Sequence, residues 1–252
     1  MSTLWQSIVS LWAWLVLVVC ILLWFPTLVL VRLFTLPFDR AAYVTGYLFR
    51  RIGPVMATLN PLWRFRYSGT MPSNPRTPFV VVSNHESFAD ILLISHLPWE
   101  MKWLSKAELF RIPVMGWMMW LVGDIPVKRG FGPSAVEALE RCRRALSQRV
   151  SVMIFPEGTR SRTAELLPFK DGAFRLAIEA GVPILPLAVS GTRTALPKAN
   201  WRFGRSVAVV RVLEPVETAG LSMADVPSLK AKVREMIVRA RDALEGTTKQ
   251  LP

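Results

Sequence analysis

The sequence predicts an α/β fold, in which a mixed, partly parallel sheet is flanked by helices and preceded by an apolar membrane-anchoring segment. Short apolar runs rich in β-branched residues alternate with longer stretches of helical periodicity, which is typical of strands joined by crossover helices. The first thirty residues are almost wholly apolar, which predicts the anchor.

The short apolar runs predict the strands, and the stretches of helical periodicity predict the helices. Strands are expected within residues 65–78 and at 79–83, 101–106, 123–130, 150–155, 183–189 and 207–212. Helices are expected from residue 91, at 133–148, at 169–180 and at 229–244. Gly181 directly follows the third of these helices, where glycine commonly ends a helix.

The anchor is predicted from residues 4–31. Residues 11–31 are long enough to cross a bilayer core at about 1.5 Å per residue. The segment could instead pair with residues 40–60 as a two-helix hairpin that lies in one leaflet. The sequence leaves these two arrangements open, and Pro26 could kink the helix in either. A cleaved signal peptide is disfavoured, because there is no basic region before the apolar run and no small-residue cleavage site.

Charge and composition favour a membrane partner over a nucleic acid. The formal net charge is +13, and there are ten tryptophans. No charged side chain precedes Arg32, whereas six arginines and only one acid, Asp39, lie between Arg32 and Arg66. A basic collar after an apolar segment is attracted to anionic lipid and, by the positive-inside rule, places the rest of the chain in the cytoplasm. No nucleic-acid-binding motif is found. The two cysteines, Cys20 and Cys142, predict no disulfide framework, and no Cys/His spacing predicts a metal site.

A polar turn containing a histidine and an aspartate follows the expected strand at 79–83. It runs Ser83-Asn84-His85-Glu86-Ser87-Phe88-Ala89-Asp90. Five residues on one regular helix would separate two side chains by about 140°. His85 and Asp90 therefore meet only if His85 lies on the turn and Asp90 on the helix. Asp90 would then orient the imidazole, whose other nitrogen would be a base. Taken alone, the spacing fits a structural turn histidine better.

A second polar turn, rich in phosphate-binding residue types, follows the expected strand at 150–155. It runs Phe155-Pro156-Glu157-Gly158-Thr159-Arg160-Ser161-Arg162. Gly158 lets the backbone approach a ligand, and the two arginines offer forked donors to a phosphate. The turns at His85, Lys106, Arg129 and Glu157 all follow expected strands, so they could share one edge of the sheet.

These stretches resemble the glycerolipid acyltransferase family, which includes the 1-acylglycerol-3-phosphate acyltransferases. Residues 84–90 are similar to its N-H-x-S-x-x-D block, and residues 155–162 to its F-P-E-G-T-R-S block. Residues 123–129 and 182–187 resemble two further blocks. Within the first of these, Pro126 stands where members usually carry an apolar residue, and Lys128 where they carry an acid.

The resemblance implies transfer of an acyl chain from acyl-CoA or acyl-carrier protein to the sn-2 hydroxyl of lysophosphatidic acid, with no further cofactor and no metal. It implies that His85 is the general base and that Asp90 orients it. The substrate-binding residues that it implies are Lys106, Arg129, Glu157, Gly158, Thr159 and Arg160. Lys170 could meet phosphate, although its place at the start of a helix explains it slightly better. The expected parts are a membrane-anchoring segment (1–60), an acyltransferase domain (61–246) and a loose tail (247–252).

Several alternatives stay open at this stage. The acceptor could be another lysophospholipid or a lyso-aminolipid. A non-catalytic lipid-binding protein at the membrane would keep the apolar segment and the basic collar but would not need His85 and Asp90. The Met- and Trp-rich stretch at 113–122 could line an acyl-chain tunnel or could simply pack in the core. The second histidine, His96, is expected to be structural or partly exposed.

Overall fold

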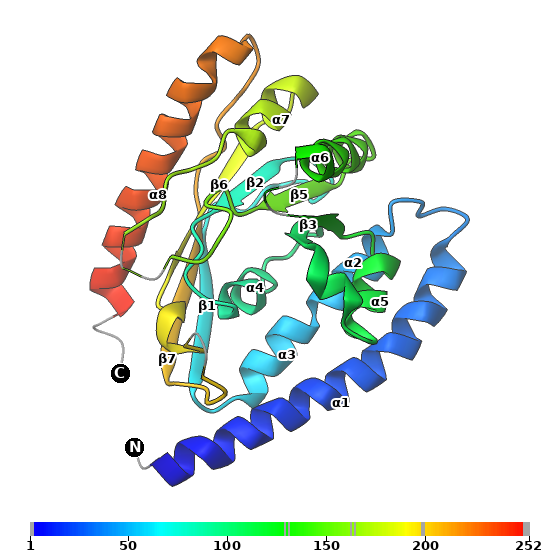
Figure 1. The fold of residues 1–252 in the computed structure, drawn as a ribbon, viewed down its shortest axis with the longest axis vertical. Coiled ribbons are helices and arrows are strands. Elements are labelled where there is room, and N and C mark those ends of the chain that lie inside the picture. Colours follow the sequence, from blue (N-terminus) through cyan, green and yellow to red (C-terminus); the bar gives the residue numbers. More distant parts are fainter. Residues whose placement is uncertain are drawn as a thin grey trace.

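A computed structural model describes residues 3–128, 130, 132–161, 163, 165–197 and 200–248. Its centre is a seven-stranded sheet with the strand order β1-β7-β6-β2-β5-β3-β4 (Figure 1). The strands are β1 (Trp63–Gly69), β2 (Val80–Ser83), β3 (Met101–Lys106), β4 (Ile125–Val127), β5 (Ser151–Ile154), β6 (Ile184–Ser190) and β7 (Ser206–Val212). The predicted α/β class is confirmed.

The sheet is mostly parallel, which determines where the strand ends meet. Only the β6–β7 pairing is antiparallel, and the remaining neighbours run in the same direction. Val82 of β2 pairs with Ile154 of β5, and Lys106 of β3 pairs with Val127 of β4. The carboxyl ends of β2, β5, β3 and β4 therefore lie along one edge. This edge carries the polar turns that the sequence singled out.

Helices cover both faces of the sheet. One face packs against α6 (Gly132–Ser147), α7 (Gly172–Ala180) and α8 (Val226–Thr248) through a large apolar cluster that includes Phe174 and Ile237. The short helix α4 (Ala89–Ile94) packs on the other face, where Leu93 and Ile94 are fully buried. The described residues also form three short 3₁₀ helices: η1 (Ala107–Arg111), η2 (Thr192–Thr194) and η3 (Met223–Asp225).

The three N-terminal helices and α5 form a further layer beyond α4. They are α1 (Thr3–Thr35), α2 (Tyr43–Arg50), α3 (Ile52–Leu59) and the Met/Trp-rich α5 (Met115–Leu121). Leu28 of α1, Met56 of α3 and Met118 of α5 meet in one buried cluster, so part of the Met/Trp-rich stretch is core packing. Helix α1 runs diagonally along the outside of this layer (Figure 1). Of the described helices, α1 alone is long and apolar enough to cross a membrane.

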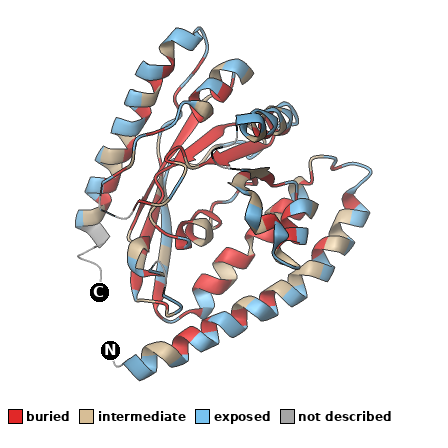
Figure 2. Ribbon diagram, in the orientation of Figure 1, coloured by how far each residue is buried: buried red, intermediate tan, exposed pale blue. Residues whose placement is uncertain are grey.

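Helix α1 is attached to the rest of the protein along most of its length. Hydrogen bonds join it to carbonyl groups elsewhere in the fold: Gln6 to Phe203, Trp12 to Leu59, Trp14 to Trp201, and Trp24 to Leu48. Its outer side nevertheless leaves large apolar side chains exposed (Figure 2), among them Leu11, Leu22 and Phe34. The helix is therefore both an integral part of the fold and an apolar surface.

Two local differences from the expected helices have clear causes. Residues 40–60 form two short helices instead of one, with Arg51 between them. Pro54 has no N–H to donate to the carbonyl of Arg50, so a continuous helix would lose a hydrogen bond there. Helix α7 begins at Gly172 and not at residue 169, because the backbone N–H of Lys170 instead donates to the carbonyl of Pro156, at 2.9 Å.

Candidate active site

The first polar turn is fixed where β2 ends. Its Asn84 side chain exchanges two hydrogen bonds with the backbone of Val189 in β6, at 2.9 Å and 2.8 Å. His85 follows on the turn, and α4 begins at Ala89, so Asp90 lies in the first helical turn. The Ser87 hydroxyl accepts a hydrogen bond from the Ala89 N–H at 3.3 Å. This is the turn-plus-helix arrangement that the five-residue spacing required.

His85 and Asp90 are in direct contact, with 2.7 Å between Nδ1 and Oδ2. The same carboxylate oxygen accepts the backbone N–H groups of Glu86 (2.7 Å) and Ser87 (2.9 Å). The other oxygen accepts the hydroxyl of Thr192. An ionised carboxylate only accepts hydrogen bonds, so Nδ1 of His85 carries a proton, and Nε2 is the ring atom that can accept one. A base oriented in this way can remove a proton from a substrate hydroxyl.

The imidazole is also held by an aromatic neighbour. The ring of Phe155 stacks on His85 with the centroids 3.9 Å apart and the planes 15° apart. Trp103 lies behind Phe155, with 6.1 Å between ring centroids. His85 is only 8% exposed, so stacking and hydrogen bonding together leave the imidazole little freedom to reorient.

Glu157 links the second polar turn to the first. One carboxylate oxygen accepts the backbone N–H of His85 at 2.7 Å, and the other accepts the N–H of Leu167 at 2.8 Å. The backbone N–H of Ser161 donates to the carbonyl of His85 at 2.9 Å. Burial raises the pKa of Glu157, and the two backbone donors partly oppose that shift. Glu157 therefore holds the histidine turn in place, and its contact with substrate stays a prediction.

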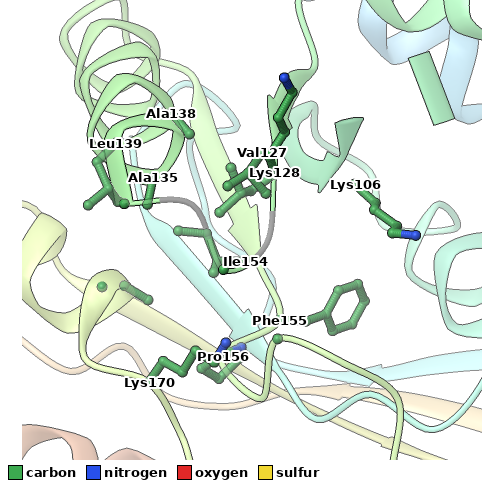
Figure 3. A pocket seen from close by; sticks show the side chains of 16 residues that line it. Lys106, Val127, Lys128, Ala135, Ala138, Leu139, Ile154, Phe155, Pro156 and Lys170 are labelled. Carbon is green, nitrogen blue, oxygen red and sulfur yellow. The ribbon is translucent and has the colours of Figure 1, made fainter. Parts of the chain in front are cut away.

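A pocket of about 380 Å³ opens beside these turns (Figure 3). Its lining combines apolar side chains, such as Leu104, Leu139 and Ile154, with the cations Lys106, Lys128 and Lys170. Lys106 is half-exposed and lies 3.5 Å from Glu108. The pocket can thus receive a molecule that is part apolar and part anionic.

Gly158 shapes one side of this pocket. Its φ of 70° lies in the left-handed region that favours glycine. A Cβ at this position would lie 2.9 Å from Nζ of Lys170, so glycine also makes room for that lysine. Thr159 is exposed and Arg160 is half-buried on the same loop, and Arg160 has no carboxylate partner among the residues described.

The structure brings most of the predicted residues to one edge. His85, Asp90 and Glu157 form one hydrogen-bonded unit, and Lys106 and Gly158 line the adjoining pocket. Arg129 and Arg162 lie outside the described residues. No group of three or more His, Cys, Asp or Glu that could hold a metal ion occurs in the described part of the chain.

Sequence reasoning missed or ranked lower four contributors to this region. Thr192 follows β6, and only the fold brings it to Asp90. Phe155 belonged to a quoted motif, but its stacking on His85 had no sequence signal. Lys170 was considered for phosphate binding but ranked slightly below a role at a helix start, and Lys128 was noticed only as a departure from the family pattern; both line the pocket. His96 is half-buried and donates from Nδ1 to the carbonyl of Leu92 at 2.9 Å, which fits its expected structural role.

Glu86 adds a titratable group directly beside the base. Its carboxylate lies 3.4 Å from a guanidinium nitrogen of Arg193. Burial, followed by the nearby charge of Asp90, raises the pKa of Glu86 to about 7, although Arg193 opposes the shift. The turn therefore holds a carboxyl group that changes charge near neutral pH.

The fold and this site define an α/β protein that presents an oriented histidine base beside a cationic pocket. The sequence model of the family described as Acyltransferase matches residues 64–190, half of the chain. The chain belongs to the acyltransferase family.

Individual relatives agree with this assignment. The human 1-acyl-sn-glycerol-3-phosphate acyltransferase alpha is 40% identical over 166 residues, which are 65% of this chain and 59% of that protein. A chloroplastic 1-acyl-sn-glycerol-3-phosphate acyltransferase of Brassica napus is 44% identical over 130 residues, covering 52% of this chain and 38% of that protein. The chain thus spans between 38% and 59% of the length of these two curated relatives.

A solved structure is similar over almost its full length. The crystal structure of the 1-acyl-sn-glycerophosphate (LPA) acyltransferase PlsC from Thermotoga maritima superposes with a TM-score of 0.82 at 25% sequence identity. The match covers 97% of this chain and 98% of that one. The similarity therefore includes the N-terminal helices, which lie outside the family model.

Proposed function

We propose that this protein transfers a fatty acyl chain from an acyl thioester to the sn-2 hydroxyl of 1-acyl-glycerol-3-phosphate, giving phosphatidic acid. The observation that carries the proposal is the contact of 2.7 Å between His85 and Asp90, at the strand edge that also carries Lys106 and the Gly158–Arg160 loop. The names of the relatives support the choice of acceptor.

The chemistry needs one base and no covalent enzyme intermediate. Nε2 of His85 accepts the proton of the acceptor hydroxyl while its oxygen attacks the thioester carbonyl. The tetrahedral intermediate then collapses, the carbon–sulfur bond breaks, and the proton on His85 passes to the departing thiolate. Asp90 stabilises the imidazolium between these two transfers. The only two cysteines, Cys20 and Cys142, are buried in other parts of the fold, and no acyl-enzyme step is assigned to them.

Recognition of the acceptor phosphate is assigned to the cations at the strand edge. Lys106 is the last residue of β3 and Arg160 follows β5, and each carries a donor group that pairs well with phosphate oxygens. The apolar wall of the pocket, including Leu104 and Leu139, offers a surface for the acyl part of a substrate. The donor is acyl-CoA or acyl-carrier protein, and no other cofactor is assigned.

The protein associates with a membrane through α1, and we assign the catalytic domain to the cytoplasmic face because of the basic collar that follows this helix. A helix of 33 residues is about 50 Å long. The fold contacts it from Gln6 to Trp24, so it cannot cross the bilayer without drawing the attached loops into the lipid. We therefore assign α1 to one leaflet, with its exposed apolar side in the acyl region.

The test is acyl transfer by the purified full-length protein in lipid. Palmitoyl-CoA and palmitoyl-acyl-carrier protein are offered separately, with lysophosphatidic acid and a panel of other lysolipids. We expect His85→Ala to lower turnover by about 10²–10⁴-fold without unfolding the protein. His96→Ala is the matched control, since it removes the only other histidine.

Each outcome has a defined meaning. Phosphatidic acid formation that depends on His85 supports the proposal and identifies the donor. Transfer only to a different lysolipid keeps the mechanism and replaces the acceptor. Normal turnover in a folded His85→Ala protein would refute the assigned base, and absence of transfer with every pair would favour a lipid-binding role.

A further inference from the structure

A second pocket, of about 300 Å³, lies at the opposite end of the strands from His85. One lining residue, Lys102, precedes Lys106 by four positions on β3, which is about 13 Å along a strand. Another, Asp124, precedes β4, whose carboxyl end leads to the active-site edge. The other walls come from the end of α1, the loop after it, the end of α5 and the last turns of α6. We call this the basic pocket, after its cations Arg32, Arg40, Lys102, Arg141 and Arg144.

The acid in the lining of the basic pocket is already neutralised. Arg50 donates two hydrogen bonds to the carboxylate of Asp124, one of them at 3.0 Å. The backbone N–H of Trp103 donates to the same carboxylate at 3.0 Å. Asp124 and the buried Glu100 are matched by the two buried cations Arg50 and Lys102, so neither acid offsets the arginines around the opening.

Lys102 supplies a buried donor at the floor. Its side chain is only 3% exposed, and Nζ donates to the carbonyl of Ala42 at 2.9 Å and to Glu100 at 3.1 Å. An ammonium group has three N–H donors. The third has no acceptor among the residues that the structure describes, and a buried donor without a partner is costly. A bound anion at this floor would satisfy it.

The walls add cations that lack acidic partners. Within the described ranges, Arg40 and Arg144 form no ion pair, and Arg32 donates only to the backbone carbonyls of residues 39 and 40. Arg141 pairs with Glu137 at 2.7 Å on the exposed surface of α6. Several guanidinium groups around one cavity match the oxygens of a phosphate group.

An exposed apolar stretch borders the basic pocket. Between Arg32 and Arg40 the chain exposes four large apolar side chains: Leu33, Phe34, Leu36 and Phe38. Phe34 and Phe38 are 77% and 75% exposed. Apolar side chains next to arginines are typical of a segment that enters a leaflet while its cations stay at the level of the lipid phosphates. The exposed apolar stretch therefore favours a lipid headgroup over a soluble anion as the occupant of the basic pocket.

We propose that the basic pocket binds the phosphate headgroup of one anionic phospholipid from the leaflet in which α1 lies. The site is separate from the acceptor site, which lies at the other end of the strands, and it does not depend on the acyl-transfer reaction. Its lipid holds the end of α1, the loop at residues 39–42 and the end of α6 together at the membrane surface.

The test counts the lipids that the full-length protein retains in native mass spectrometry from detergent. Dioleoyl phosphatidylglycerol is compared with dioleoyl phosphatidylcholine, which has the same acyl chains but no net charge. We expect one retained phosphatidylglycerol and no retained phosphatidylcholine. The double variant Arg40→Gln/Arg144→Gln should bind phosphatidylglycerol about tenfold more weakly or worse. Both side chains are exposed, so the fold should be unaffected.

Three controls separate the possible sources of binding. Arg66→Gln/Arg111→Gln removes two exposed arginines outside the basic pocket, and Lys106→Gln alters the active-site edge. Both should retain the lipid as the unmodified protein does, and inorganic phosphate at equal concentration should not displace it.

Equal losses of lipid binding in both double variants would indicate diffuse surface charge, and loss of lipid binding in Lys106→Gln would place the lipid in the active site. Displacement by phosphate alone would indicate a soluble anion, and no retained lipid an empty pocket. Any of these four results would overturn the proposal.

Discussion

The carboxylate of Glu157 accepts the backbone N–H of His85 at 2.7 Å, and this hydrogen bond joins the two polar turns of the sequence, beside the one from the Ser161 N–H to the His85 carbonyl. Its other oxygen holds Leu167, ten residues further along the same loop. Because both carboxylate oxygens of Glu157 accept backbone N–H groups, we infer that Glu157 affects the reaction by holding His85 in position. The family motifs at 84–90 and 155–162 are therefore one structural unit, although 72 residues separate the bonded pair.

Glu157→Gln tests this positioning role. An amide has only one acceptor oxygen, so its NH₂ group would face one of the two backbone N–H donors. We expect the free energy of unfolding to fall by about 1–3 kcal/mol and kcat to fall with it. Glu165→Gln, at an exposed position in the same loop, should change neither. Denaturant titration and steady-state kinetics would check this. A raised KM with unchanged stability would instead assign Glu157 to substrate binding alone.

Thr192→Val tests the support behind Asp90. Valine has the shape of threonine but cannot donate a hydrogen bond to the buried Oδ1 of Asp90. We expect a loss of about 1–2 kcal/mol in stability and a roughly tenfold lower kcat, with little change in KM. Thr192→Ser keeps the hydroxyl and should retain most of the activity. Equal activity of the valine and serine variants would show that the Thr192 hydroxyl is not required to support Asp90 in catalysis.

Glu86 gives the stability of the protein a specific dependence on pH. Burial is the main reason that its pKa rises from 4.5 to about 7. Between these values the folded state keeps a proton that the unfolded state releases, so stability falls as pH rises through this window. The free energy of unfolding should therefore fall between pH 4.5 and pH 7.5. We expect this fall to be roughly 1–3 kcal/mol smaller in Glu86→Gln than in the unmodified protein. Denaturant titrations at both pH values measure it, and parallel profiles would contradict the assignment.

Lys106→Met and Arg160→Met test phosphate recognition. If each side chain contacts the acceptor phosphate, its removal should raise KM for lysophosphatidic acid by about tenfold or more. The rate with monoacylglycerol, which has no phosphate, should be unchanged. Kinetics with both acceptors in the same detergent check this. Equal losses with the two acceptors would mean that the lysines and arginines at this edge do not recognise phosphate.

Much of the sheet could be predicted because buried parallel strands are short apolar runs between polar turns. The strand at Met101–Lys106 begins and ends where the sequence indicated, and the turn at His85 places Asp90 on the helix as its spacing required. The strand order and the antiparallel β6–β7 pair could not be read in the same way. They depend on contacts between segments that are distant in sequence and share no local pattern.

The parts of the site that were missed depend on tertiary contacts between segments that are distant in the sequence. Thr192 reaches Asp90 only because β6 lies beside β2, and Phe155 stacks on His85 only because β5 is the other neighbour of β2. The sequence also predicted an apolar anchor without showing whether it crosses the bilayer. The hydrogen bonds of Gln6, Trp14 and Trp24 to the rest of the fold support the proposal that it lies in one leaflet.

The attachment of α1 has a consequence for how the protein is made. Gln6 and Trp14 bond to carbonyls 197 and 187 residues later in the chain, so α1 leaves the ribosome long before its partners exist. At about 5–20 residues per second, the wait is roughly 10–40 s. During this time the most apolar segment of the protein can pack only against the early helices α2 and α3, while the rest of its partner surface is still missing. We therefore expect α1 to enter the membrane first, and the nascent catalytic domain to fold onto a helix that already lies there.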